Sequence, residues 1–277
     1  MNGAWLRAWG RSSNAWERLS PRIAAATGWR VWNPGRYGAP WHRLFREAYP
    51  LRERPILLFG LNPGPYGMGQ TGIPFTDVRR LRRCLPRLEQ KLRERGRVPR
   101  VPGLAPRSLR PFLTREFESS AVRVYRFLET GWGSAEEGWR RVGVANSCPL
   151  LFMDRTGKNR TPADLGAAIR RRIGASPRAA RLCRAVEAQR GESALEAIAA
   201  AKPRGVVLLG KDVQGCLGSG LTGRLGEGKV LAWRHPARAV PELWARGLLE
   251  SLGSRSERAS SSSGTVMRRI LRFRRSP

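Results

Sequence analysis

The sequence is poor in the side chains that bind transition metals or form disulfides. It contains only four cysteines and two histidines in 277 residues. The cysteines show no paired spacing, so we expect free thiols rather than a zinc site; they stand at positions 84, 148, 183 and 216. With so few histidines and cysteines, a transition-metal site is not expected. The sequence therefore predicts a protein that needs no metal and no other cofactor.

Long apolar runs are absent as well. A membrane-spanning helix needs about 18 or more apolar residues in succession, and no run in this chain approaches that length. Residues 1–19 carry tryptophans and arginines but lack the apolar segment and small-residue cleavage site of a secretory signal. We therefore expect neither a membrane protein nor a secreted one, and we expect a monomer.

Acidic residues are scarce relative to basic ones. The chain has 52 Lys and Arg against 21 Asp and Glu, a formal net charge of +31. The tail over residues 254–277 holds seven arginines and one glutamate, so most of the excess belongs to the rest of the chain. Such an excess favours a polyanionic partner, above all nucleic acid, because phosphate contacts release counterions. A merely solvated basic surface, an acidic protein or a membrane surface are the alternatives.

Four short apolar runs predict the buried strands of a parallel sheet. They lie at residues 54–59, 141–146, 204–211 and 229–233. Segments with helical spacing separate them, including a helix over 14–19 capped near Asn14, one over 118–128, two within 163–202 broken near Gly191, and a last one from Pro241. The order predicts an α/β fold, a three-layer α/β/α sandwich with a central four-stranded, mostly parallel sheet.

Polar side chains follow three of these strands. Asn62 lies in a loop rich in glycine and proline directly after the first strand, Asn146 ends the second, and His235 follows the fourth. The carboxyl ends of parallel strands open onto one crevice, where open α/β folds bind ligands. We therefore expect these three side chains to meet in one site.

The loop over residues 60–75, GLNPGPYGMGQTGIPF, resembles the first active-site motif of the single-strand-selective monofunctional uracil-DNA glycosylases, a branch of the uracil-DNA glycosylase superfamily. Residues 146–152, NSCPLLF, residues 157–165, GKNRTPADL, and His235 followed by Pro236 resemble the same family. The resemblance runs from about Val31 to Leu249. It departs from the family pattern at Leu61 and Tyr66, where Met and Phe are more usual, and in a shorter segment after His235.

The resemblance implies a monofunctional DNA glycosylase that hydrolyses the N-glycosidic bond of uracil, and of oxidised uracil derivatives, in single- and double-stranded DNA. Such an enzyme initiates base excision repair wherever DNA is kept, in the cytoplasm or nucleoid of a bacterium or the nucleus of a eukaryote. It implies three domains: an N-terminal helical arm over 1–30, a glycosylase-like catalytic domain over 31–253, and a disordered basic tail over 254–277.

The resemblance also implies roles for individual residues. Asn62 would orient the attacking water and His235 would stabilise the leaving uracil. Asn146 would pair with the imide edge of the base, and Phe75 would stack on it. The substrate-binding set is Leu61, Gly64, Met68, Phe75 and Asn146. The DNA-binding set is Gly157, Lys158, Asn159, Arg160, Lys211 and Arg238, the last as the side chain that fills the gap left by the flipped base.

Two observations bear on rival functions. None of the five lysines lies beside Asn62 or His235 in the sequence, which disfavours an imine-forming lyase step. A mismatch-specific glycosylase acting on G·U or G·T pairs shares the Gly-x-Asn-Pro-Gly core, but Asn146 and His235 argue against it. A non-catalytic nucleic-acid-binding protein is the third reading, and the presence of all three polar site residues argues against that.

Overall fold

The computed structural model describes residues 2–84, 86–87, 90, 105–236 and 240–260. Its centre is a parallel four-stranded sheet in the order β3-β2-β6-β7. The strands are β2 (Ile56–Gly60), β3 (Val142–Asn146), β6 (Gly205–Leu209) and β7 (Val230–Trp233). The predicted α/β fold with four strands is confirmed, and the sheet is parallel throughout.

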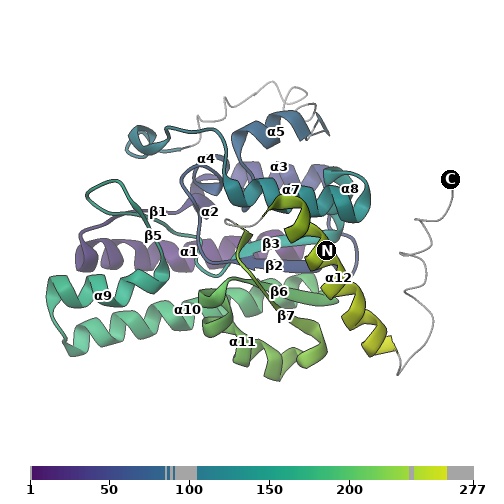
Figure 1. Ribbon diagram of the computed structural model, residues 1–277. Coiled ribbons are helices and arrows are strands. Elements are labelled where there is room, and N and C mark those ends of the chain that lie inside the picture. Colours follow the sequence, from purple (N-terminus) through teal and green to yellow (C-terminus); the bar gives the residue numbers. More distant parts are fainter. Residues whose placement is uncertain (1, 85, 88–89, 91–104, 237–239, 261–277) are drawn as a thin grey trace, which may run out of the picture.

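Side chains alternate across the sheet, so each face has its own apolar core. Ile56 and Leu58 point into one cluster, and Leu57 and Phe59 point into the other. The first cluster is covered by α3 (Ala39–Ala48), α7 (Ser119–Trp132), α8 (Ala135–Arg141) and α12 (Pro241–Ser260). The second is covered by α1 (Asn2–Thr27), α10 (Pro177–Ala201) and α11 (Lys211–Leu225). In Figure 1, α3, α7 and α8 lie above the sheet, with α10 and α11 below it.

A second, smaller sheet was not predicted from the sequence. It is antiparallel, in the order β1-β4-β5, with β1 (Arg30–Trp32), β4 (Leu151–Met153) and β5 (Asn159–Arg160). Strands of two or three residues are too short to show an alternating pattern, which explains why it was missed. The remaining short elements are α2 (Pro34–Tyr37), α4 (Met68–Thr71), α5 (Val78–Cys84), η1 (Arg110–Phe112) and η2 (Glu227–Lys229).

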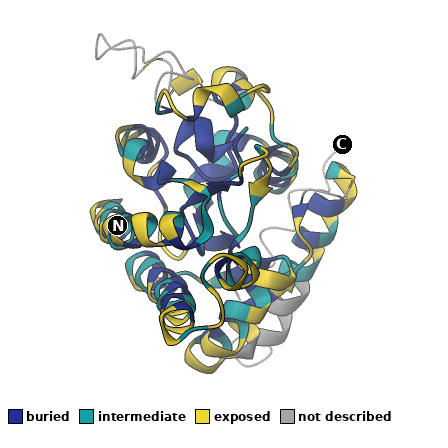
Figure 2. Cartoon of the chain, turned by 90° about the vertical axis from the view of Figure 1, so that its left-hand side faces the viewer, coloured by how far each residue is buried: buried dark blue, intermediate teal, exposed yellow. Residues whose placement is uncertain are grey.

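The first helix is longer than predicted. The expected start near Asn14 is wrong, because α1 begins at Asn2 and Asn14 lies in its interior. Trp5, Trp16 and Ile23 are fully or almost fully buried along one face of α1. This face packs on α10 and reaches the core beneath the sheet. Figure 2 shows the same division over the whole molecule, with buried residues on the sheet and on the inner faces of helices.

The predicted break near Gly191 is also wrong. The two helices of this region are α9 (Pro162–Ile173) and α10, and they separate at Gly174, whose φ of 73° favours glycine. Ser176 then caps α10 by accepting a hydrogen bond from the Ala179 amide at 3.2 Å. Gly191 stays helical, because a single glycine costs a helix only about 1 kcal/mol.

At the C-terminal end, α12 continues beyond Gly253 to Ser260, into the segment expected to be a tail. The rest of that segment, residues 261–277, lies outside the described residues. Within the part of the chain that the structure describes, no helix is long and apolar enough to cross a membrane.

Candidate active site at the carboxyl edge of the sheet

A cleft of about 540 Å³ opens where the strands of the parallel sheet end. This volume falls in the range of small-molecule sites. The three polar residues predicted to meet, Asn62, Asn146 and His235, all line it. Most of the predicted binding residues do so too: Leu61, Gly64, Met68, Phe75, Gly157, Lys158 and Asn159. Segments far apart in sequence therefore converge on one site, as the strand topology requires.

The side chain of Asn62 is held in one orientation. Its Nδ2 donates to the carbonyl oxygen of Arg160 at 3.1 Å and to that of Pro63 at 3.3 Å. Because both donor contacts are made with backbone carbonyls, Oδ1 is the acceptor that remains for a ligand. The cleft therefore presents a fixed amide oxygen at this point.

Phe75 and Asn146 meet at the end of β2. A Cβ built on Gly60 would lie 2.6 Å from Phe75 Cζ and 2.6 Å from Asn146 Oδ1, so both side chains occupy the space that a larger residue would need. Phe75 is buried and has a φ of 54°, a left-handed conformation that is costly for a bulky residue. The loop thus holds an aromatic ring beside the amide of Asn146.

The strand pairing fixes Asn146 as well. It pairs in register with Gly60, and its Nδ2 donates to Met68 Sδ at 3.2 Å. Beyond it, the Ser147 and Cys148 amides donate to the carbonyls of Gly60 and Leu61 at 2.9 and 3.0 Å. The two strand ends are therefore bonded together past the edge of the sheet.

Behind this junction lies a buried arginine that sequence reasoning missed. Arg190 of α10 is 4% exposed, and its guanidinium approaches Ser147 Oγ at 3.4 Å while pairing with Glu187 at 2.9 Å. Ser147 Oγ in turn donates to the Leu61 carbonyl at 3.0 Å. Arg190 lies on a helix far from Ser147 in the sequence, and one more arginine in a basic chain does not stand out, so the sequence gave no sign of this contact.

His235 lies on the opposite side of the cleft and is exposed. Gly210, with a φ of 95°, packs against it; a Cβ there would lie 3.2 Å from His235 Cβ. The preceding strand end is anchored, because Gln214 Nε2 donates to the Trp233 carbonyl at 2.8 Å and Trp244 Nε1 to the Arg234 carbonyl at 3.0 Å. The other histidine, His42, is fully buried in α3 against the ring of Trp9, 4.0 Å away.

The loop between β4 and β5 forms another wall. Asp154 Oδ1 accepts hydrogen bonds from the amides of Thr156 and Lys158 at 2.9 and 3.0 Å, and Arg160 pairs with Oδ2 at 2.7 Å. Burial by itself would raise the pKa of Asp154, but these hydrogen bonds, with one from the Thr156 hydroxyl, lower it to about 2. The Arg160 side chain thus has a structural partner and does not line the cleft, whereas Lys158 does.

Glu118 is a cleft residue that the sequence did not reveal. It directly precedes α7, and its carboxyl group lies where a Cβ on Gly64 or Gly67 would be, so both positions need glycine. Its amide donates to Asp77 Oδ2 at 2.9 Å. Burial of the carboxyl, with the charge of Asp77 and against a hydrogen bond from Ser120, raises the pKa of Glu118 to about 7. The signal in the sequence that could have pointed to a residue filling this space is the pair of glycines, Gly64 and Gly67.

Two further residues of the predicted DNA-binding set remain. Lys211 begins α11 next to Gly210, and Arg238 lies outside the described residues. No lysine lies near Asn62 or His235 in the sequence, but in the folded chain Lys158 lines the same cleft as both. That argument against an imine-forming step is therefore wrong.

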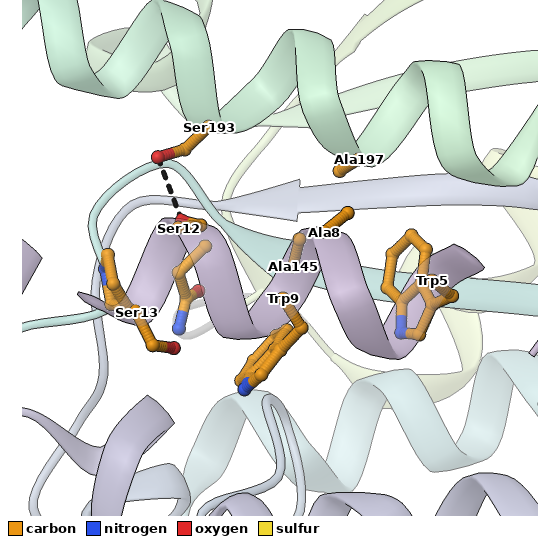
Figure 3. A pocket seen from close by; sticks show the side chains of 10 residues that line it. Trp5, Ala8, Trp9, Ser12, Ser13, Ala145, Ser193 and Ala197 are labelled. Atoms are coloured by element: carbon orange, nitrogen blue, oxygen red, sulfur yellow. Dashed lines mark hydrogen bonds between the residues drawn. The ribbon is translucent and has the colours of Figure 1, made fainter. Parts of the chain in front are cut away.

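A second hollow lies between α1, β3 and α10 and is also lined by Asn146. Figure 3 shows Trp5 and Trp9 on α1 beside it, with Ser12 Oγ bonded to Ser193 Oγ at 2.8 Å. Its volume of about 30 Å³ holds a water molecule but not a base. Within the described ranges, no group of three or more His, Cys, Asp or Glu side chains gathers.

A family model for the uracil DNA glycosylase superfamily matches residues 47–243 of the chain. This segment contains the whole parallel sheet and every described residue of the predicted site. The chain belongs to the uracil DNA glycosylase superfamily.

Individual relatives in the superfamily agree. The chain is 37% identical over 160 residues to the single-strand selective monofunctional uracil-DNA glycosylase of Rattus norvegicus, and 36% identical to those of Mus musculus and Bos taurus. The matched segment covers 57% of this chain and only about half of each relative, 54% for the rat and mouse proteins and 55% for the bovine one. The crystal structure of wild-type Pedobacter heparinus SMUG2 is 19% identical and covers 83% of this chain and 89% of its own, with a TM-score of 0.55. It supports the fold.

Proposed function

We propose that this protein is a monofunctional uracil-DNA glycosylase, which cleaves the bond between N1 of uracil and C1′ of its deoxyribose. The observation that carries the proposal is the convergence of Asn62, Asn146, Phe75 and His235 on one cleft. The relatives named as uracil-DNA glycosylases add support. The reaction consumes water, leaves an abasic deoxyribose in the DNA and releases free uracil.

Asn62 positions the water. As the N1–C1′ bond lengthens, the sugar gains oxocarbenium character and becomes electrophilic at C1′. Asn62 Oδ1 accepts a hydrogen bond from a water molecule and so aims the lone pair of the water oxygen at that carbon, because Nδ2 is occupied by the Arg160 and Pro63 carbonyls. An amide is too weak a base to take the proton, so its contribution is orientation.

His235 stabilises the departing base. The electrons of the broken bond pass to uracil, where negative charge gathers on O2, and a donor aimed at that oxygen stabilises the transition state more than the ground state. An N–H of His235 serves as that donor from the exposed side of the cleft. The attacking water releases one proton when its oxygen bonds to C1′, and the uracil anion takes up one proton from the surrounding water, so the reaction balances.

Asn146 and Phe75 recognise the base. Uracil presents a donor at N3 and an acceptor at O4, which an amide meets with its oxygen and its NH₂ group. The contact with Met68 Sδ at 3.2 Å fixes which end of the amide faces which way. Phe75 offers its ring to the flat face of the flipped base. Leu61, Gly64 and Met68 complete the wall of the pocket.

Phosphates of the DNA are held on the other walls. Gly157, Lys158 and Asn159 line the cleft directly after the Asp154 turn, where backbone amides and a cation can meet a phosphate. Arg160 supports the same turn through Asp154, and it connects the turn to Asn62 through its carbonyl.

The test is release of uracil from a labelled oligonucleotide, measured under single turnover in chelator with no added metal. We expect abasic product from uracil-containing DNA and none from the matching thymine oligonucleotide. Asn62→Ala should slow the reaction far more than it weakens DNA binding. Absence of abasic product with wild-type enzyme in excess would overturn the proposal.

A second arm of the same test asks whether Lys158 forms an imine with the opened sugar. Borohydride added during turnover should trap no protein–DNA adduct, and Lys158→Gln should still produce abasic sites. A trapped adduct that disappears in the Lys158→Gln variant would make the enzyme a lyase.

A further inference from the structure

Beside the base pocket, an exposed aromatic ring separates the cleft from a neighbouring basic hollow. Phe117 lines both the 540 Å³ cleft and an adjoining space of about 420 Å³, whose other lining residues are Arg79, Arg82 and Glu116. The described residues include three exposed large hydrophobic side chains, and Phe117, at 46% exposure, is the aromatic one. The proposed function gives no role to Phe117.

The exposure of Phe117 is built into the fold. The segment that carries it is held by hydrogen bonds to buried side chains on either side of Phe117. Gln70 Nε2 donates to the Arg115 carbonyl at 2.6 Å, and the Glu118 amide donates to Asp77 Oδ2 at 2.9 Å. Gln70 is 2% exposed and Asp77 is fully buried. With its backbone anchored before and after it, Phe117 is held outward at the rim.

The charges around Phe117 suit a polyanion. Arg79 and Arg82 on α5 line the hollow, and Arg115 lines the cleft, with its guanidinium over the ring of Tyr66, 5.7 Å from the centroid. The one carboxylate lining the hollow, Glu116, approaches Arg82 at 3.6 Å as an exposed pair. Exposed pairs of this kind contribute little, so the hollow keeps its positive character.

We infer that Phe117, Arg79 and Arg82 form a subsite for the nucleotide next to the flipped uracil in a single DNA strand. The base of that nucleotide stacks on Phe117, and its phosphate lies in the hollow against the two arginines. Aromatic rings combined with a basic groove are how single strands are bound without reading sequence. The inference rests on the proposed function, since it places the flipped uracil in the adjoining cleft.

The subsite has a consequence for strand preference. In a duplex, the flipped uracil frees one face of the neighbouring base, but the edge of that base is still paired and its other face still stacked, so reaching Phe117 requires a second base pair to open. In a single strand no pair has to open. The subsite therefore favours uracil in single strands over uracil in U·A pairs.

The first experiment measures binding alone, so it does not depend on uracil release. Fluorescence anisotropy with a uracil-free oligothymidylate should show about tenfold weaker binding for Phe117→Ala, the typical value of one stacked base. Phe117→Tyr should bind like the wild type, and Phe117→Leu should resemble Phe117→Ala. Thermal unfolding should be unchanged, because the side chain is exposed. Unchanged affinity in Phe117→Ala, or full affinity in Phe117→Leu, would overturn the stacking role.

The second experiment locates the nucleotide. Oligonucleotides are shortened so that uracil loses its neighbour on the 5′ side or on the 3′ side, and kcat/KM is measured for each. One of the two truncations should slow the wild type about tenfold and have no effect on Phe117→Ala. Equal losses in both proteins would overturn the subsite. Failure of every substrate to release uracil would instead overturn the proposed function.

The third experiment tests the arginines. Each phosphate contact on a single strand contributes about 0.7 to the slope of log affinity against log salt. Arg79→Gln with Arg82→Gln removes the contact with one phosphate and should therefore lower that slope by about 0.7. Arg178→Gln, an exposed arginine of α10 that does not line the hollow, is the matched control and should leave the slope unchanged. Equal slopes in all variants would overturn the proposed phosphate contact with Arg79 and Arg82.

Discussion

The two sides of the cleft are built differently. On the side of β2 and β3, the side chains of Asn62 and Asn146 each donate a hydrogen bond within the protein. A glycine at position 60 leaves just enough room for Phe75 and Asn146. On the side of β7, His235 is exposed, and Gln214 and Trp244 anchor the backbone that precedes it. The amide side is thus fixed by contacts of its own side chains, whereas His235 lies on the exposed side of the cleft.

The largest effect is expected from enlarging Gly60. Gly60→Ala would place a methyl group 2.6 Å from both Phe75 and Asn146, so two site residues must move. A displacement of about 1 Å can cost about 100-fold in rate, and here two groups shift, so we expect a larger loss in single-turnover uracil release.

The control for this change is Gly191→Ala in α10, where a Cβ meets no atom within 4 Å. It should keep full activity and gain up to about 1 kcal/mol of stability from the better helix former. Equal activity in the two variants would mean that the amide side is more adaptable than its contacts indicate.

His235→Leu should lower the rate by roughly 100-fold, the usual loss when one donor to a developing oxyanion is removed. Because His235 is exposed, the melting temperature should stay at the wild-type value. Calorimetry beside single-turnover kinetics checks both parts. A large fall in melting temperature would show that the two sides of the cleft are equally built into the fold.

Asn146→Asp should affect selectivity more than stability. Aspartate lacks the amide donor that meets O4, and a mismatched polar group costs about 1–3 kcal/mol, so uracil release should fall about tenfold or more. Release of cytosine, whose C4 amino group is a donor, should rise relative to uracil. The measurement is a pair of oligonucleotides that differ only in uracil or cytosine; an unchanged ratio would remove Asn146 from base recognition.

The smallest effect concerns Glu118 and pH. Its pKa is raised from 4.5 to about 7 in the folded protein, so between these values the folded state keeps a proton that the unfolded state has released. Stability from this group is therefore lost as pH rises through that window. Glu118→Gln stays neutral, so its melting temperature should fall less than that of the wild type when the pH is raised from about 5 to about 8. Glu192→Gln, on the exposed part of α10, should follow the wild type.

The sequence predicted those parts of the structure that depend on local pattern. The four strands were visible as apolar runs, and parallel topology then required Asn62, Asn146 and His235 to share an edge. What the sequence could not show was pairing at a distance. Glu118 beside Gly64 joins segments more than fifty residues apart, and the partner of Arg160 is evident only once the turn is folded. The start of α1 was missed because Asn14 was taken as the cap of a helix over 14–19, although it lies inside α1.

That first helix has a consequence for how the chain folds. Trp16 and Ile23 of α1 are buried in a cluster with Leu182 and Val186 of α10, and the two helices share one of the largest helix–helix contacts in the molecule. During synthesis, α1 must therefore wait for α10, which follows it much later in the chain, and its tryptophans stay uncovered meanwhile. Contacts so distant in sequence slow folding, and exposed apolar surface invites aggregation. We expect newly made chains to depend on chaperones until α10 has emerged.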